Sequence, residues 1–550
     1  MSKVVKCFIL FFLTSLCLPT ALRAQVINAT SCAQSDVQTA LNSVTASTAT
    51  VNIPAGTCQW TTAINYTAPA AVTSLTIRGQ TTCTGSGDPA NNNLACTDNT
   101  IIKDGTAANG DFMLKLSASG FIRLTGITFQ SSTTKNDGVV MINGGTGANE
   151  IRIDHNRFNS DTGGTASAML DVSGCSYGVA DHNIFQNLTG TTGFGIVPYN
   201  GVNCNGNEGS NQDGAWAVPT GFGGANFLVV EQNLFQNNTA GIGSNQAVDC
   251  DFGGKAVYRF NTFFNGAHLQ THPTGSGVQL RGCRATEIYK NQWIVTIPFT
   301  TAFSNTNFFF SSGPALIWGN NPVGQGYASW VQLTDCRSPS GSSRCGYSPP
   351  TPPNGFGFCG SGSGWDGNTN ASGYPCIDQP TRGQGDLLTG SFPTKCDQTT
   401  GCSTFNGTWP HQKLEPLYFW LNQFQPLGGG NDNGLIVLNG SIWTQNQDYY
   451  VSSDPNSPTD CTGFTGATGV GCGARSARPA TCTSGVAYFS TDQGSWNTSG
   501  NGAGNGVLDI CSSTNTWTNA FYTPYAYPHP LTLGSGTPPA APTNLKAVVN

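Results

Sequence analysis

The chain has 550 residues, of which only 9% are charged, with 23 Lys plus Arg against 29 Asp plus Glu and a formal net charge of -6. A nucleic-acid-binding protein needs a surplus of basic residues to neutralise phosphates, so this balance argues against nucleic acid as a partner. With 38% hydrophobic and 10% aromatic residues, the composition also excludes a disordered chain.

The first 24 residues have the pattern of a secretory signal peptide. Lys3 and Lys6 precede the apolar run Cys7–Leu18, and Leu-Arg-Ala stands before Gln25 as the expected cleavage site. The run is too short to span a bilayer, and we expect no membrane span in the mature chain. The sequence therefore predicts an extracellular protein, either secreted or held at the cell surface.

Cysteine usage agrees with export. Two of the 20 cysteines lie in the predicted signal, and the remaining 18 allow up to nine disulfides in an oxidising compartment. Short separations indicate loop-stapling pairs, although spacing does not fix the connectivity: Cys336/Cys345, Cys396/Cys402 and Cys461/Cys472. No C-x-x-C pair is present, which disfavours a structural zinc site.

A nine-residue pattern recurs along the chain, with mostly apolar residues at positions two and four, Asn at position seven and Phe at position nine in most copies; the first copy is imperfect. Copies begin at Phe121, Glu150, Tyr177, Phe227, Lys255, Ala285, Pro314 and Pro416. Four of the six intervals between successive position-seven residues fall between 27 and 30 residues; these residues are Asn156, Asn183, Asn233, Asn261, Asn291, Asn320 and Asn422. A fixed period of this size indicates one structural unit stacked on itself.

The alternation within each copy has a period of two, which favours strands over helices. A second strand-like run precedes most copies. We therefore predict an all-β fold, a right-handed parallel β-helix. The position-seven Asn residues are expected to stack as an internal ladder, and the position-nine aromatic residues are expected to lie in the core.

These repeats resemble the pectate-lyase-like β-helix superfamily over roughly residues 35–424. The segment SDVQTALNSV, with Ser35 as the expected N-cap, is similar to the helical cap with which many members begin. The resemblance implies the fold; it does not fix an activity, because such folds serve lyases, hydrolases and non-catalytic fibres.

The predicted organisation follows from the repeats and the composition. After the signal at 1–24 we expect a β-helix at 25–323 and a Gly/Pro/Cys-rich, disulfide-pinned insertion at 324–413. The last coil or coils and a β-rich C-terminal cap follow at 414–532, and a flexible tail ends the chain at 533–550.

Position five of the repeat is predicted to face outward and collects chemically active residues. In chain order this position-five column includes Asp154, Asp181, Glu231, Arg259, Tyr289, Trp318 and Trp420. Neighbouring rungs are about 4.8 Å apart, so the carboxylates would either raise one another's pKa or recruit a cation, with Ca²⁺ the candidate metal. Arg259 would neutralise developing negative charge, and the three aromatic residues would form a platform for sugar rings. The structural alternative for the charged residues is a salt-bridged face, and the structural alternative for the aromatic residues is burial under inserted loops.

Two further groups of residues are candidates for acid–base chemistry. The segment HLQTHPTGSGVQLRGCR brings His272 and Arg281 together as a candidate base and anion clamp, with His268 and Arg284 nearby; a disulfide-tethered turn is the structural alternative. The motif IRIDHN is similar to the IDH segment of pectate lyases, which would match Asp154 and His155 to that segment's Asp and His. Imidazoles that cap a turn are the structural alternative for His155 and His182.

Two functions remain open at this point. The first is a secreted polysaccharide lyase or glycoside hydrolase acting along an outer groove. For hydrolysis, the spacing of Asp154 and Asp181 predicts retention and that of Asp154 and Glu231 inversion. The second is a non-catalytic glycan-binding solenoid, an adhesin or matrix component. The polymer, the linkage and the oligomeric state are not determined by the sequence.

Overall fold

The computed structural model describes part of the chain in detail. It covers residues 24–533 except for 108–111, 132–137, 146–148, 161–167, 187–193, 202–203, 205–214, 217, 237–245, 266–267, 273–281, 297–305, 325–328, 335–379, 386–395, 398–400, 403–411, 425–433, 440–442, 453–460, 462 and 500–503.

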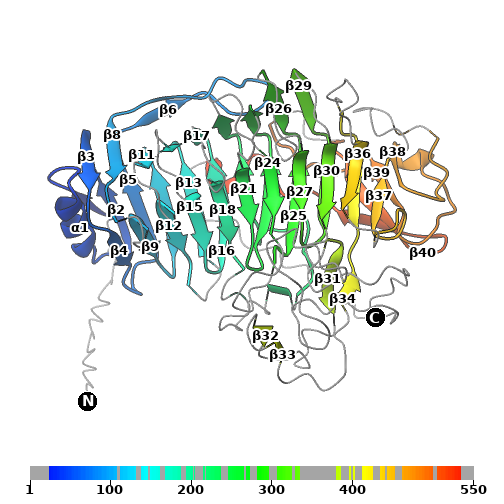
Figure 1. Ribbon diagram of the computed structural model, residues 1–550, viewed down its shortest axis with the longest axis horizontal. Coiled ribbons are helices and arrows are strands. Elements are labelled where there is room, and N and C mark those ends of the chain that lie inside the picture. The colour runs from blue at the N-terminus through cyan, green and yellow to red at the C-terminus, as the bar shows by residue number, and fades with distance from the viewer. Residues whose placement is uncertain are drawn as a thin grey trace, which may run out of the picture.

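Three long parallel sheets wind into a β-helix whose rungs follow one another along the long axis (Figure 1). Sheet A has 12 strands: β1 (Gln25–Asn28), β2 (Thr48–Asn52), β5 (Ser74–Arg78), β10 (Phe121–Thr125), β13 (Asn149–Asp154), β16 (Ser176–Asp181), β19 (Leu228–Glu231), β22 (Lys255–Arg259), β25 (Ala285–Tyr289), β28 (Ala315–Trp318), β35 (Leu417–Trp420) and β37 (Tyr449–Val451). Sheet B has nine: β3 (Gly56–Trp60), β8 (Thr100–Asp104), β11 (Thr128–Ser131), β14 (Arg157–Ser160), β17 (Ile184–Gln186), β20 (Leu234–Gln236), β23 (Thr262–Phe264), β26 (Gln292–Val295) and β29 (Asn321–Gly324). Sheet C has 10: β4 (Ile64–Thr67), β9 (Leu114–Ser117), β12 (Val140–Asn143), β15 (Ala168–Ser173), β18 (Phe194–Tyr199), β21 (Gln246–Cys250), β24 (His268–Thr271), β27 (Thr306–Phe310), β30 (Ser329–Thr334) and β36 (Gly434–Asn439). The predicted all-β parallel solenoid is confirmed.

A ladder of asparagines fixes the turn between sheets A and B. Asn183 Oδ1 accepts hydrogen bonds from the backbone N–H of Asn156 at 3.0 Å and from its Nδ2 at 3.1 Å. The same pair of bonds recurs between each successive Asn up to Asn422. All seven side chains are buried, and the predicted internal ladder is confirmed.

The position-nine aromatic residues form a second ladder on the strands of sheet B, two residues after the Asn ladder. Ring centroids are 5.4 Å apart for Phe129 and Phe158, and 4.6 Å apart for Phe263 and Trp293, with near-parallel planes. Phe185 and Phe235 complete the stack between them. Because strand side chains alternate, these rings share the interior with the aliphatic residues of all three sheets.

The N-terminal end of the solenoid is covered by the helix α1 (Gln34–Asn42), which buries Val37, Ala40 and Leu41. The predicted N-cap at Ser35 is wrong, because the helix begins one residue before it. Ala33 is the N-cap and makes no side-chain capping bond. Ser31 Oγ instead accepts from the Ala33 N–H at 3.1 Å and donates to Asp36, which secures the first turn from outside the helix.

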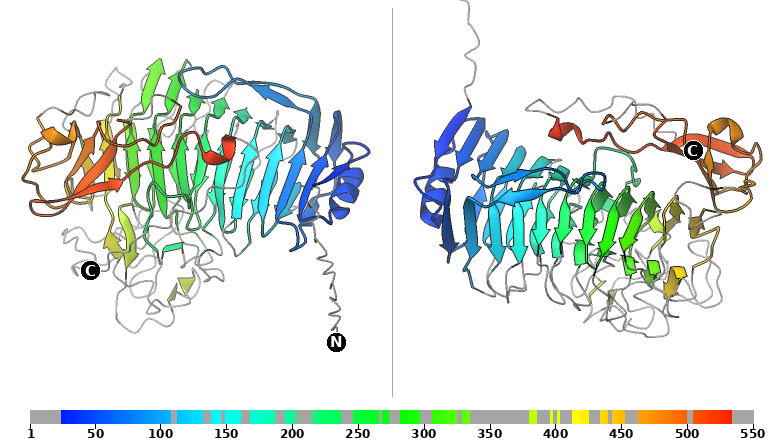
Figure 2. Two further views of the ribbon diagram at one scale, coloured as in Figure 1. Left: turned by 180° about the vertical axis from the view of Figure 1, so that it is seen from behind. Right: turned by 90° about the horizontal axis from the view of Figure 1, so that it is seen from above.

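A four-stranded cap lies at the C-terminal end. It consists of β38 (Val470–Gly473), β39 (Ala487–Ser490), β40 (Val507–Ser513) and β41 (Thr516–Tyr522), with the 3-10 helix η5 (Arg475–Ala477) beside β38. From β41 the chain runs back along sheet A as residues 523–533, which we call the strap, and ends in η6 (Pro530–Thr532) (Figure 2). The strap lies over rungs that are remote from it in the sequence.

A hairpin runs along the turns between sheets A and B. It contains β6 (Thr82–Thr84) and β7 (Ala95–Thr97), and its Gly87 N–H donates to Gln232 O at 3.0 Å. The strap reaches this hairpin as well, because the Tyr527 hydroxyl donates to Asp88 at 2.6 Å.

Six disulfides lie within the described residues. They are Cys32–Cys58, Cys83–Cys96, Cys175–Cys204, Cys250–Cys283, Cys461–Cys472 and Cys482–Cys511. The predicted pair Cys461/Cys472 is confirmed. The predicted pair Cys336/Cys345 lies outside the described residues, as do the side chains of Cys396 and Cys402.

Most of the predicted insertion at 324–413 lies outside the described residues, as do the predicted signal and tail. Its described parts form two small antiparallel pairs, β31 (Arg382–Gly385) with β34 (Gln412–Leu414) and β32 (Cys396–Asp397) with β33 (Gly401–Cys402). Within the described parts of the chain, no helix is long and apolar enough to cross a membrane.

The Asn ladder leads to a prediction about stability. Asn261→Ala removes the acceptor for two bonds from Asn233 and three donor contacts to Val230 O, Arg259 O and Asn291. Each buried group left without a partner costs about 1–3 kcal/mol, so we expect a loss of at least about 3 kcal/mol in chemical denaturation. The exposed Asn42→Ala is the control, with an expected change of about 0.5 kcal/mol or less. Equal effects of the two substitutions would contradict the ladder's role.

Candidate functional site

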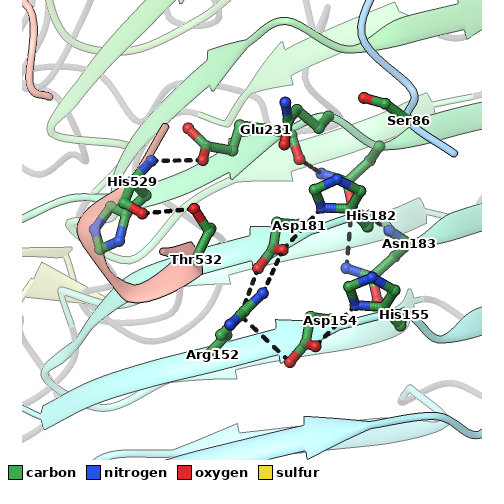
Figure 3. Close-up of polar contacts among 12 residues, drawn as sticks. Ser86, Arg152, Asp154, His155, Asp181, His182, Asn183, Glu231, His529 and Thr532 are labelled. Atoms are coloured by element: carbon green, nitrogen blue, oxygen red, sulfur yellow. Dashed lines mark hydrogen bonds and ion pairs between the residues drawn. The ribbon is translucent and has the colours of Figure 1, made fainter. Parts of the chain in front are cut away.

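The position-five column forms in the register that the repeat predicts. Asp154 pairs with Asp181, Asp181 with Glu231, and Glu231 with Arg259 on neighbouring strands of sheet A. The column continues through Tyr289 and the two tryptophans. Figure 3 shows the three carboxylates on adjacent rungs, with the strap residues His529 and Thr532 beside them.

The column is not an exposed groove, and that expectation is wrong. Asp154, Asp181, Glu231 and Arg259 are all 0% exposed. Position three of the repeat supplies the cations that make this burial tolerable: Arg123 forms two bonds to Asp154 at 2.7 and 2.6 Å. Arg152 forms two bonds to Asp181 at 3.0 and 2.9 Å. Burial by itself would raise the pKa of Asp154, but the bonds from Arg123 and His155 hold this pKa well below its usual range.

The strap completes this network with backbone groups. Arg259 pairs with Glu231 at 2.7 Å and donates to the carbonyls of Tyr525 and Ala526. Glu231 accepts from the His529 N–H at 2.7 Å. Arg152 also donates to Leu531 O at 2.9 Å. The charged side chains of the column therefore hold the strap against sheet A, because they form hydrogen bonds with strap backbone groups that would otherwise be buried without partners.

This arrangement does not suit the predicted metal or the predicted hydrolytic pairs. The carboxylates of Asp154, Asp181 and Glu231 are each engaged by a guanidinium, which leaves no set of converging free oxygens for Ca²⁺. Among the described residues, no group of three or more His, Cys, Asp or Glu side chains could hold a metal ion. The catalytic and calcium-binding roles of these residues stay predictions that the geometry does not favour.

The aromatic residues of the column stack as expected but do not form an open platform. The ring centroids of Tyr289 and Trp318 are 4.7 Å apart, and those of Trp318 and Trp420 are 5.8 Å apart. All three side chains are buried, and the cap residues Phe489 and Trp496 pack against them. The predicted sugar platform is therefore the seam between solenoid and cap, where cap residues cover the rings.

His155 and His182 stand at the turn after the two aspartates. Their rings stack with centroids 5.0 Å apart and planes at 2°, and each Nδ1 lies 2.9 Å from the carboxylate that precedes it (Figure 3). Both have a left-handed φ, 55° and 53°, and the same turn position on later rungs is occupied by Gln232 and Phe260 with equivalent φ values. Since residues without acid–base chemistry fill the same place, we interpret the two imidazoles as turn residues.

A second cluster of ionisable residues lies on the outer face of sheet C. Val248 and Leu269 point into the core, so Asp249 and its strand partner Gln270 point outward. Asp251 follows on the same side, and the Nδ1 atom of His272 lies 3.4 Å from its carboxylate. This brings the predicted His272 together with two aspartates that sequence reasoning did not select.

We call Asp249, Asp251 and His272 the acid–base cluster. Hydrogen bonds from two neighbouring segments fix the backbone around it. The His272 N–H donates to Cys250 O at 2.8 Å, and the His272 carbonyl accepts from the Cys283 N–H at 3.1 Å. The disulfide Cys250–Cys283 ties the same two strands together. Such bracing fixes the position of the imidazole relative to the carboxylates, as an acid–base site requires.

Asp249 and Asp251 have different environments. Both are 5% exposed, but Asp249 Oδ1 has no hydrogen-bond partner within the described structure, whereas Asp251 is paired with His272. Burial, with a smaller contribution from the charge of Asp251, outweighs the opposing effect of His272 and raises the pKa of Asp249 to about 7. The His272 side chain is 32% exposed and is the member open to solvent. A carboxyl that keeps its proton beside a carboxylate–imidazole pair provides an acid and a base in one place.

The remaining predicted residues of this segment behave differently. Arg281 and the side chain of His268 lie outside the described residues. Arg284 is buried and donates to Glu415 at 2.6 Å, so it serves as a structural ion pair. Asp249 and Asp251 were missed because they lie in QAVDCDFGG, which precedes a repeat copy and lacks its spacing. A strand-alternation analysis of the run before each copy would have placed both on one face.

Comparison with known proteins adds little. No protein-family model and no curated protein matches the chain. Among solved structures, an alginate lyase from Paenibacillus sp. str. FPU-7 is similar at 14% identity with a TM-score of 0.31, and the match covers 56% of this chain and 90% of that chain. A likeness at this level carries no argument about activity.

The ion network predicts that the strap depends on the buried charges. Arg259→Met should lower the free energy of unfolding by about 3–5 kcal/mol, because it leaves Glu231 as a buried charge without its cation and frees two strap carbonyls. Chemical denaturation measures this loss. The control is Arg78→Met on an exposed strand end, for which we expect about 0.5 kcal/mol or less. A small effect at Arg259 would show that the network does not hold the strap.

Glu287 leads to a pH-dependent prediction. Its carboxylate accepts from the Gly223 N–H at 2.7 Å and from the Tyr522 hydroxyl at 2.7 Å, yet burial raises its pKa from 4.5 to about 7. Because the folded protein holds this proton more tightly than the unfolded chain, the stability from this group is complete below about pH 4.5. It is lost as the pH rises through about 7, a change of about 3 kcal/mol.

The matched variant is Glu287→Gln, which keeps both hydrogen bonds and cannot ionise. Denaturation at about pH 5 and about pH 8 should show a smaller pH-dependent loss for the variant than for the native protein. An identical pH dependence in the two proteins would mean that Glu287 ionises normally in the folded state.

Proposed function

We propose that this protein is an extracellular carbohydrate-active enzyme that cleaves a polysaccharide on the outer face of sheet C. Asp249 is the proton donor, and the Asp251–His272 pair is the base. The observation that carries the proposal is the buried Asp249 carboxyl, whose Oδ1 has no partner, two residues from a carboxylate paired with an imidazole. Buried carboxyls without compensation are costly, and they concentrate where a proton must be transferred.

A polymeric substrate is supported by the fold. A parallel β-helix presents equivalent outer positions rung after rung at intervals of about 4.8 Å, which gives an extended surface rather than a closed pocket. The six described disulfides support an oxidising, extracellular setting. The low charge favours a polymer that is not densely anionic.

The chemistry has two branches that share the same acid. Asp249 gives its proton to the oxygen of the leaving sugar, and the Asp251–His272 pair accepts a proton. If that proton comes from water, the bond is hydrolysed; if it comes from a ring carbon of the sugar, an unsaturated product forms by elimination. Hydrolysis yields reducing ends alone, whereas elimination also yields a product that absorbs in the ultraviolet.

The test is to incubate the purified full chain with a panel of neutral and acidic polysaccharides and to measure both products. Asp249→Asn should lower the rate by a factor of about 10²–10⁴, as should His272→Gln. The native activity should also fall as the pH rises above about 7, because Asp249 then loses its proton.

The control is His182→Asn. Asn tolerates the left-handed turn and keeps a donor toward Asp181, so we expect full activity. Full activity of Asp249→Asn would sink the proposal. Glycan binding without turnover of any polymer would instead support a non-catalytic adhesin or matrix protein.

A further inference from the structure

A cavity of about 520 Å³ lies at the C-terminal end of the solenoid, away from the acid–base cluster. Its walls come from the last strands of two sheets, β36 and β37, and from the cap loop 463–469. In sheet C, β27 and β30 separate β36 from β24, the strand that leads to His272. The volume is within the range of sites that hold small ligands.

The walls are held in place without a ligand. The Gly469 N–H donates to Asn446 Oδ1 at 2.7 Å, which joins the cap loop to the turn before β37. Ser452, which lines the cavity, forms a β-bridge with Val470, and the disulfide Cys461–Cys472 links the two ends of the segment that carries the cap loop. A site that is already formed loses little entropy when a ligand binds.

The position of the Phe464 ring, which lines the cavity, depends on Gly471. A Cβ atom at Gly471 would come within 2.3 Å of the Phe464 ring, so only glycine lets this ring pack so closely on β38. Phe464 is half-buried in this position, and Tyr449 also lines the cavity.

The chemistry of the lining identifies the ligand class. None of the described residues that line the cavity is Asp, Glu, Lys, Arg or His. Amides and hydroxyls lie beside the two rings, on Gln445, Asn446, Thr465 and Thr468. Neutral amides and hydroxyls suit sugar hydroxyl groups, and an aromatic face suits the C–H face of a sugar ring.

The geometry points to a second carbohydrate site, in which this cavity binds a neutral glycosyl unit without cleaving it. Thr465, Thr468 and Gln445 are exposed and form the mouth of the cavity, through which a chain end or a side-branch sugar enters. The site goes beyond the proposed activity, because it would hold neutral sugar where none of the described lining residues is an acid or a base.

The test is calorimetric titration of the full chain with neutral oligosaccharides of glucose, mannose, galactose and xylose. We expect saturable binding of at least one of them. Phe464→Ala should weaken this binding at least about tenfold, because it removes the stacking ring, whereas Phe464→Tyr should retain it. The matched control is Phe521→Ala, which removes a phenylalanine that is 46% exposed elsewhere on the cap and should leave the affinity unchanged.

The same titration is repeated with Asp249→Asn, which should bind as the native protein does. Weakened binding in Phe464→Ala together with native polysaccharide turnover would separate this site from the proposed active site. Absence of saturable binding with all four sugars would overturn the inference, as would an affinity equal in Phe464→Ala and the native protein. A thermal melt of Phe464→Ala shows whether the variant is folded, and the Tyr variant tests the ring if it is not.

Discussion

The constraint on which this structure depends is the register between coils. Each rung can bury its inner face only against its neighbours, and the buried side-chain amide of each position-seven Asn before Asn422 bonds both to the backbone and to the amide of the following Asn, as Asn156 does with Leu124 O and Asn183. A slip of one residue would turn every inward side chain outward. The ladder therefore fixes which residues become neighbours across rungs, and the charged column, the stacked rings and the acid–base cluster all follow from that register.

The structure treats its buried charges in two ways, and the difference indicates function. On sheet A each carboxylate of the column has a guanidinium partner, and the remaining donors hold the strap, so these ions stabilise the contact between solenoid and cap. On sheet C, Asp249 is also buried but lacks a partner at Oδ1. Buried ions that are paired with an opposite charge typically have a structural role. A buried carboxyl with an unpartnered oxygen costs stability and is typical of a site of proton transfer.

The sequence was sufficient for the fold, the ladder and the neighbours within the column, because all three depend on a local period. It was not sufficient to show what covers the column. The contacts that bury Arg259 come from Tyr525 and Ala526, which are 266 and 267 residues away and belong to no repeat. Asp249 was overlooked for a related reason, since the strands of sheet C carry a weaker pattern than the nine-residue copies. Periodicity identifies the inside of a solenoid, whereas its outer face is determined by the segments that fold back onto it.

The central claim is that Asp249 carries a proton near neutral pH because the cost of burying its charge outweighs the opposing effect of His272. Infrared difference spectroscopy between the native protein and Asp249→Asn, recorded across a pH titration, isolates the carboxyl band of this residue. The account predicts a protonated carboxyl that ionises near pH 7. A band that shows an ionised carboxylate down to the ordinary value of 3.8 would contradict it, and with it the assignment of the acid.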